Sequence, residues 1–392
     1  MNPSEKSKPF VAIACGGTGG HLFPGMAVAE QLQLRGCDVA LLISPKEIDQ
    51  QAAKSAQGMQ VLTLPVVGLQ NRNYFSFAGS FLKSLLATRR IFRQRRPDAV
   101  LAMGGFTSAP PVWVGKEFGA KIFLHESNTI PGRANRYLAR FVDLAFIGFP
   151  EAAARLRARK ITKAGTPVRP QFLPSAGQLP SECRVALGLD PERLTVLVVG
   201  GSQGASGLNE MVLAALPRLA GKNWQWLHLT GANDFEKVRS AYTRLGLKAV
   251  VKPFLAEMGL ALGAATACVS RAGASSLAEI AALRLPSLLV PFPAAADNHQ
   301  FYNATAFATT GAARCLEQKN TDPEKTAAIL TELMENQGSR TTVSLALEQW
   351  HAPKAAAEIA EGILAAITLQ REKAAAKTCS CGRAHGRARH AH

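Results

Sequence analysis

The chain of 392 residues is long enough for two domains, and its hydrophobic content of 47% is sufficient for packed cores. Seven cysteines, an odd number in mostly isolated positions, favour reduced thiols in a cytosolic protein over a disulfide framework. The amino-terminal stretch lacks a signal-peptide pattern, and no uninterrupted run of about 18 apolar residues occurs. Neither a secretory leader nor a transmembrane helix is therefore expected.

The net charge of +17 is concentrated in the first part of the chain and in its tail. Residues 1–170 hold 23 Lys and Arg against 10 Asp and Glu, and residues 371–392 hold six against one, whereas the stretch between them is nearly neutral. Such a surplus suits a nucleic-acid-binding protein. It suits equally an enzyme whose first domain rests on an anionic lipid surface.

The first predicted unit is a buried strand at 10–15, followed by the loop GGTGGH and a helix from Pro24 to Leu34. A strand, a glycine loop and a helix in this order are typical of phosphate binding. The loop departs from the dinucleotide fingerprint, and no P-loop motif occurs, so a dinucleotide oxidoreductase is disfavoured. His21 follows four glycines, and we interpret it as a catalytic or ligand residue in preference to a structural histidine.

Further strands are predicted at 39–43, 61–67, 98–103 and 121–124. The last two end in the sequences GGFTSAP and HESN, which places a second glycine loop and Glu126 at the edge that holds His21. Open α/β sheets bind ligands at the carboxyl ends of their strands. Glu126 is therefore our preferred general base, with His21 next, and the alternative for Glu126 is a solvated surface carboxylate.

The stretch 68–96 combines aromatic and basic side chains and contains no acidic residue. This pattern is typical of a helix at the headgroup boundary of an anionic membrane. The alternative is an ordinary amphipathic helix that covers the sheet. The residues expected to contact the membrane are Phe75, Phe77, Phe81, Lys83, Arg89, Arg90 and Arg93.

The second half repeats this organisation after a proline-rich linker. A strand at 194–199 leads into the loop GGSQGA, further strands are predicted at 226–229, 250–251 and 267–269, and a long helical stretch is predicted at 341–369.

The stretch 270–300 carries the main candidate ligand site of the second half. A helix opens at Ala274 after a glycine turn, and its free N–H groups and positive dipole end suit a diphosphate. Glu279 lies one turn further, where a carboxylate can accept hydrogen bonds from sugar hydroxyls. The alternative is a plain helix start followed by a solvated glutamate. No Asp-x-Asp pair occurs, so we expect glycine-loop N–H groups, helix dipoles and Arg169 to hold the diphosphate without a metal or other cofactor.

The motifs GGTGGHLFPGMAVA, MGGFTSAP, HESN, GTPVR, GGSQGA, RAGASSLAEI and DNHQFYNA resemble those of the MurG glycosyltransferases over about residues 10–365. The resemblance implies an α/β protein of the GT-B fold, in which two Rossmann-like doubly wound domains face each other across a cleft. It implies an acceptor- and membrane-binding domain at 9–168, a UDP-sugar-binding domain at 181–349, and a helix at about 350–369 that packs back on the first domain. The basic tail at 370–392 lies outside the family pattern and is expected to be disordered.

The reaction implied is inverting transfer of N-acetylglucosamine from UDP-N-acetylglucosamine to the 4-hydroxyl of the N-acetylmuramyl unit of lipid I, which gives lipid II for peptidoglycan synthesis. The partners implied are both substrates, the anionic cytoplasmic face of the cell inner membrane as a peripheral attachment site, and other cell-wall synthesis proteins, with no nucleic acid. The alternatives are another GT-B enzyme, such as a glycolipid synthase or a UDP-sugar epimerase, and a non-enzymatic binder of anionic lipid or nucleic acid.

The resemblance also implies roles for individual residues. His21 and Glu126 match residues that act on the acceptor hydroxyl, and Glu279 matches a contact to the ribose. Leu255 matches a backbone contact to uracil, and Gln300 matches a contact to the sugar. The implied donor-binding set is Thr18, Gly19, Gly20, Asn128, Arg169, Ser202, Leu255, Ala274, Ser275, Ser276, Leu277, Ala278, Glu279 and Gln300.

Overall fold

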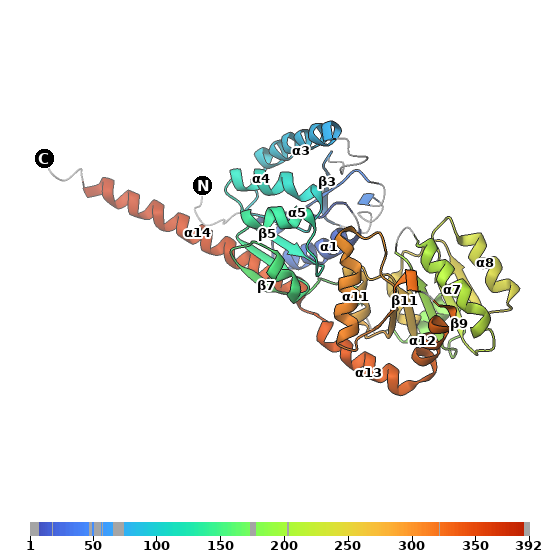
Figure 1. Cartoon of the computed structure of the whole chain (residues 1–392). Coiled ribbons are helices and arrows are strands. Elements are labelled where there is room, and N and C mark those ends of the chain that lie inside the picture. The colour runs from blue at the N-terminus through green and yellow to red at the C-terminus, as the bar shows by residue number, and fades with distance from the viewer. Residues whose placement is uncertain are drawn as a thin grey trace.

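The computed structural model describes residues 8–17, 19–46, 49–50, 56, 58–65, 74–172, 178–201, 204–320 and 322–387. These residues form two parallel β-sheets with flanking helices, one in each half of the chain (Figure 1). The first sheet has seven strands in the order β3-β2-β1-β4-β5-β6-β7, and the second has six in the order β10-β9-β8-β11-β12-β13. Both are doubly wound, Rossmann-like sheets, as the sequence predicts.

The strands of the first sheet are β1 Phe10–Ala14, β2 Asp38–Ile43, β3 Gln60–Thr63, β4 Ala99–Ala102, β5 Lys121–Glu126, β6 Leu144–Ile147 and β7 Ile161–Lys163. The helices that accompany them are α1 Gly19–Leu34, α3 Tyr74–Gln94, α4 Ala109–Glu117 and α5 Arg133–Leu138, followed by the short 3₁₀ helices η2 Ala139–Phe141 and η4 Pro170–Phe172.

The strands of the second sheet are β8 Thr195–Val199, β9 Gln225–Leu229, β10 Ala249–Lys252, β11 Ala267–Ser270, β12 Ser287–Leu289 and β13 Arg314–Cys315. The helices of this half are α6 Pro180–Ala186, α7 Ser206–Leu219, α8 Phe235–Arg244, α9 Met258–Ala264, α10 Ala274–Ala282, α11 His299–Thr309, α12 Pro323–Glu335 and α13 Gln337–Leu347, and α14 Ala355–Arg387 ends the described chain.

The central strand β1 shows why the first sheet is covered on both faces. All five of its side chains are buried. Val11 and Ile13 belong to a core cluster that includes residues of α1 and α14, whereas Ala12 and Ala14 belong to a second cluster that includes residues of α3 and α4. Successive side chains of a strand point to opposite faces, so a continuous apolar run is what a strand between two helical layers requires.

Each sheet has one position where its strand order reverses. In the first sheet this position lies between β1 and β4, and in the second between β8 and β11. Ligands of open parallel sheets bind outside the carboxyl ends of the strands at such positions. The loops located there include both glycine loops of the first half, the loop after β8 and the start of α10, which are the loops that the sequence singled out.

Most predicted elements lie within two residues of their bounds in the structure, and three differ by more. The helix predicted from Pro24 begins at Gly19, and Pro24 lies inside it. The strand predicted at 61–67 ends at Thr63, with residues 66–67 outside the described part. The helical stretch predicted at 341–369 is divided into α13 and α14, because Pro353 between them cannot continue a helix.

Within the stretch 370–392, for which a disordered tail is predicted, the described residues are helical, because α14 continues to Arg387. Residues 370–381 contain no Gly or Pro and are rich in Ala, Lys and Arg, all strong helix formers. Contacts to the first domain support the beginning of this stretch: Gln370 Nε2 donates to the Gly119 carbonyl at 2.8 Å, and Arg371 pairs with Asp98 at 2.9 Å. Beyond them the helix projects away from the domain (Figure 1).

The first half of α14 completes the core of the first domain although it follows the second domain in sequence. Ile359, Ile363 and Ile367 are buried in the same cluster as Val11 and Leu101. This is the return contact that the family resemblance implies. Within the described part of the chain, no helix is both long and apolar enough to cross a membrane.

Because α14 packs into the core of the first domain, substitutions at a buried and at an exposed residue of this helix should affect the stability of the protein differently. Ile363→Ala removes a fully buried side chain and should lower the free energy of unfolding by about 2–5 kcal/mol. Leu369→Ala, on the same helix but 52% exposed, should change it by no more than about 0.5 kcal/mol. Urea denaturation of both variants measures the difference, and equally small effects would contradict a structural role for α14 in the first domain.

Candidate active site

A buried aspartate holds the glycine loop between β1 and α1. Asp49 Oδ2 accepts a hydrogen bond from the Gly17 N–H at 2.6 Å and another from the Ser44 hydroxyl. The Gly17 N–H is thus used inside the protein, and the N–H groups without intrahelical partners are those of the first turn of α1, from Gly19 onward. Asp49 is not recognisable from the sequence, because one aspartate beside a pair of glutamines forms no pattern that indicates a role.

The second glycine loop gives His21 its place. A Cβ atom on Gly104 would lie 2.6 Å from His21 Cε1, and Gly104 has a φ of +118°, so only glycine fits there. His21 Nδ1 is buried and has no hydrogen-bond partner among the described residues. Burial lowers the pKa of His21, while Glu126 and Asp49 partly oppose this shift. The side chain is therefore held as a neutral imidazole, the form that a general base needs.

Glu126, the preferred base from sequence, uses both of its carboxylate oxygens inside the protein. It lies at the end of β5, is only 2% exposed and accepts four hydrogen bonds. The donors are Asn128 N at 2.8 Å, Asn128 Nδ2 at 3.1 Å, Gly132 N at 2.9 Å and Asn135 Nδ2 at 2.8 Å. A carboxylate engaged in this way is not solvated, and its geometry favours a role in shaping the loop.

The first turns of α1 and α10 meet across the domain boundary. Ser275 Oγ donates a hydrogen bond to the Gly20 carbonyl at 3.0 Å. In an uninterrupted helix that carbonyl would accept the N–H of the residue four positions later, but this residue is Pro24, which has none. The proline thus leaves a carbonyl available for the other domain, and two positive helix ends come close together.

Arg169 and Glu279 form a mostly buried pair beside this meeting point. Their side chains are 12% and 14% exposed, and the shortest distance between charged atoms is 3.7 Å. The Arg169 guanidinium also lies over the ring of Phe23 at 4.0 Å and the ring of Phe172 at 4.9 Å. Burial lowers the pKa of Arg169 and raises the pKa of Glu279 to about 7, although Arg169 partly opposes the rise at Glu279.

The remaining donor-binding predictions have different outcomes. Residues 274–279 form the first two turns of α10 after Gly273. Gln300 Oε1 accepts hydrogen bonds from Ala272 N at 3.2 Å and Phe292 N at 3.0 Å, and Leu255 lies in the loop after β10 with 9% exposure. Thr18 and Ser202 lie outside the described residues. Among the described residues, no group of three or more His, Cys, Asp or Glu side chains is arranged to hold a metal ion.

The predicted membrane-contact stretch forms α3. Its aromatic rings contact aromatic rings of neighbouring helices, which together form one series. Ring centroids are 6.0 Å apart for Phe77 and Phe81, 5.4 Å for Phe81 and Trp113, and 6.2 Å for Trp113 and Tyr137. Because Trp113 and Tyr137 lie on α4 and α5, a search for one helical stretch in the sequence could not include them. Phe75 lies in α3, but its side chain is outside the described part.

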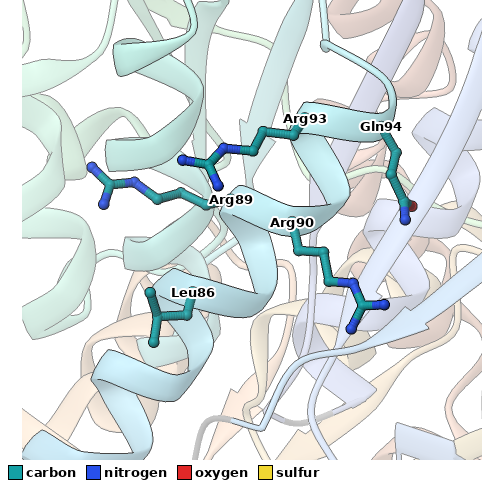
Figure 2. Close-up of a pocket in the computed structure, with 5 residues that line it drawn as sticks. All are labelled: Leu86, Arg89, Arg90, Arg93 and Gln94. Carbon is teal, nitrogen blue, oxygen red and sulfur yellow. The ribbon is translucent and has the colours of Figure 1, made fainter.

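One of the basic residues of α3 forms an ion pair within the protein. Arg89 pairs with Glu117 of α4 at 2.7 Å. Lys83, Arg90 and Arg93 are exposed. Figure 2 shows a surface pocket along this part of α3, lined by Leu86, Arg89, Arg90, Arg93 and Gln94, with Arg90 directed to the opposite side of the helix from Arg89.

Comparisons with known proteins agree with this architecture. The glycosyltransferase family 28 N-terminal domain matches residues 11–147, and the glycosyltransferase family 28 C-terminal domain matches residues 195–361. A UDP-N-acetylglucosamine–N-acetylmuramyl-(pentapeptide) pyrophosphoryl-undecaprenol N-acetylglucosamine transferase from Anaeromyxobacter sp. (strain Fw109-5) is 37% identical over 356 residues, which cover 89% of this chain and 91% of the relative.

A second relative and one solved structure extend the comparison. A transferase of the same name from Xanthomonas euvesicatoria pv. vesicatoria (strain 85-10) is 35% identical and covers 92% of this chain and 82% of its own. The crystal structure of MurG from Acinetobacter baumannii superposes with a TM-score of 0.71 at 28% identity, over 91% of this chain and 99% of that one. The chain therefore has the GT-B fold and belongs to glycosyltransferase family 28, within the MurG group of N-acetylglucosamine transferases.

Proposed function

We propose that the chain transfers N-acetylglucosamine from UDP-N-acetylglucosamine to the 4-hydroxyl of the N-acetylmuramyl unit of lipid I, with inversion at C1, and so makes lipid II for peptidoglycan synthesis. The observation that carries the proposal is the contact of Ser275 with Gly20, which brings two helix N-termini together beside Arg169 and Glu279. This arrangement combines groups that stabilise a diphosphate with a carboxylate that can bind sugar hydroxyls. The identity of 37% to a transferase of this name supports the same reaction.

The donor is proposed to bind along the first two turns of α10. Its diphosphate receives hydrogen bonds from the N–H groups of Ala274 to Ser276 and charge from Arg169, so the leaving group is stabilised without a metal. Glu279 accepts hydrogen bonds from the ribose hydroxyls, and the backbone of Leu255 contacts uracil. Gln300 and Asn128 face the sugar. Four further donor contacts are proposed only because their residues match the family motifs: Thr18, Gly19, Gly20 and Ser202.

His21 is proposed as the general base. As the acceptor oxygen attacks C1 of the sugar, His21 takes the proton of the 4-hydroxyl, and the bond from C1 to the diphosphate breaks with its electron pair leaving on UDP. Attack opposite the leaving group inverts the configuration at C1. His21 is supported over Glu126 because its imidazole is neutral and has an unpartnered Nδ1, whereas the Glu126 carboxylate already accepts four hydrogen bonds.

The aromatic and basic face of α3 is proposed to rest on the cytoplasmic surface of the inner membrane, where lipid I is located. Leu82 and Leu86 are each 57% exposed, and the ring series from Phe77 to Tyr137 continues this apolar surface over α4 and α5. The neighbouring basic residues would interact with anionic headgroups. Other cell-wall synthesis proteins remain proposed partners on the basis of the family alone.

The decisive experiment measures UDP release from UDP-N-acetylglucosamine with a lipid I analogue, in the presence of EDTA. We expect release that requires the acceptor, persists with the chelator and yields a disaccharide-linked product by mass spectrometry. Release without acceptor, or formation of an epimerised sugar, would support the UDP-sugar epimerase alternative. No release with either substrate set would support a protein that only binds.

Substitutions at the two candidate bases should have different effects. His21→Ala should lower kcat by about 10²- to 10⁴-fold, the usual contribution of a general base, with little change in donor affinity. Glu126→Gln should mainly lower stability, by about 1–3 kcal/mol for each hydrogen bond that the amide cannot accept. Steady-state kinetics and thermal unfolding separate the two effects. Loss of kcat in Glu126→Gln with an unchanged unfolding temperature would instead identify Glu126 as the base.

The raised pKa of Glu279 predicts a pH-dependent donor affinity. With a pKa of about 7, Glu279 is mostly ionised at pH 8 and mostly protonated at pH 6, and protonation removes acceptor sites for the ribose hydroxyls. The KM for UDP-N-acetylglucosamine should therefore rise by up to about tenfold from pH 8 to pH 6. Glu279→Gln is neutral at both values, so its KM should be high and nearly independent of pH. An equal pH dependence in both proteins would exclude Glu279 as the cause.

A matched pair of charge reversals tests the membrane surface. Arg90→Glu with Arg93→Glu on α3 should weaken binding to vesicles that contain phosphatidylglycerol by at least about 30-fold, since each basic residue near such a surface contributes about 1 kcal/mol. Arg244→Glu with Lys248→Glu makes the same change in charge on exposed residues of the second domain. This control should bind almost as well as the wild type in co-sedimentation. Equal weakening in both double variants would show that only net charge matters.

A further inference from the structure

Asn303 of α11 uses its whole side chain to connect the two domains. Its Oδ1 accepts hydrogen bonds from Thr129 N at 3.0 Å and Thr129 Oγ1 at 2.9 Å. Its Nδ2 donates to Asn128 Oδ1 at 3.0 Å and to the Ala272 carbonyl at 3.1 Å. The side chain is fully buried, and these four bonds satisfy both donor hydrogens and both acceptor positions of the amide.

On the donor side, α11 binds both backbone polar groups of one residue, Ala272. Gln300, one turn before Asn303, accepts the Ala272 N–H, and Asn303 donates to the Ala272 carbonyl. Gly273 follows directly as the cap of α10, so α11 fixes the point where the proposed diphosphate-binding helix begins. These bonds lie within the second domain and persist whatever the position of the first domain.

On the acceptor side, Asn303 binds the loop that follows β5. Asn128 and Thr129 belong to this loop, and Glu126 holds Asn128 through both the backbone and the side-chain nitrogen. The bonds from Asn303 to Asn128 and Thr129 cross the domain boundary, and they break if the domains separate. Asn303 therefore connects the acceptor-side loop to the start of α10 only in the closed arrangement.

The position of α11 suits this task. It lies along the boundary between the domains (Figure 1), and Phe307, one turn after Asn303, stacks on Trp350 at 4.3 Å and lies 6.1 Å from the ring of Phe149. A rim pair of Arg136 with Asp297 also crosses the boundary. Exposed ion pairs contribute little, whereas buried polar groups left without partners carry a large penalty, so the Asn303 bonds should contribute more than this rim pair.

We propose that Asn303 is a positioning residue that sets the register of the two substrates. By joining loop 126–129 to the start of α10, it fixes the distance between the acceptor hydroxyl at His21 and the donor sugar on α10. The inference rests on the proposed function and adds to it a residue that touches neither substrate. Asn303 lies in the motif DNHQFYNA, in which the family resemblance implies a role only for Gln300.

The first test compares Asn303→Ala with Asn209→Ala. Asn209 is also a buried asparagine of the second domain, but its partners, which include His228 and Asp234, all lie in that domain. Both variants should lose stability. Only Asn303→Ala should open the domains, seen as a larger radius of gyration in small-angle X-ray scattering of the ligand-free protein. A scattering profile of Asn303→Ala identical to that of the wild type would overturn the proposal.

The second test uses kinetics and a variant that is expected to fold normally. Asn303→Ala should lower kcat on the order of 10²-fold, the effect of a displacement of about 1 Å, with a much smaller change in the donor KM. Thr129→Val removes one donor to Asn303 and keeps the backbone N–H, so it should cause a milder loss. Because both changes remove the same contact, the double variant should be no worse than Asn303→Ala alone.

Losses that add in the double variant would overturn the proposal, because they would show that Thr129 and Asn303 act independently. Failure of the wild type to transfer the sugar would refute the proposed function, and the scattering comparison would still decide whether Asn303 closes the domains.

Discussion

The parallel direction of every strand in the two sheets is the constraint on which the site depends. Parallel strands place all their carboxyl ends at one edge, and the strand order of each sheet reverses beside its first strand, β1 or β8. Loops that leave neighbouring strands there diverge to opposite faces and leave a crevice. Two such edges face each other in this chain, so four separate loops contribute to one site. The sheet topology alone therefore places the candidate site at the boundary between the domains.

Two residues shape the site through atoms that they lack. Pro24 has no N–H, so the Gly20 carbonyl of α1 is available to Ser275 of the other domain. Gly104 has no Cβ, and its absence leaves the space that the His21 ring occupies. In both cases a local cost in helix or turn structure allows a contact between segments distant in the sequence.

The charged residues of the site divide into structural and reactive groups according to their partners. Glu126 and Asp49 are buried and bonded to backbone or side-chain donors, which keeps loops in place. Arg169 and Glu279 have a looser pair at 3.7 Å, and burial raises the pKa of Glu279 to about 7. A weakly satisfied, desolvated pair can exchange its partner for a ligand, whereas a carboxylate that already accepts four hydrogen bonds, such as Glu126, cannot do so without loss of stability.

The two α/β halves, the loops at the strand ends and the family could be predicted from sequence, because apolar strands, glycine turns and motif spacing are local patterns. The sequence could not show that α14 remains helical to Arg387, nor that Glu126 is enclosed by four donors. Asp49, Asn303 and the ring series through Trp113 also came only from the tertiary structure. Their roles depend on contacts between residues far apart in the chain. Such long-range contacts produce no periodic pattern in a single sequence from which they could be predicted.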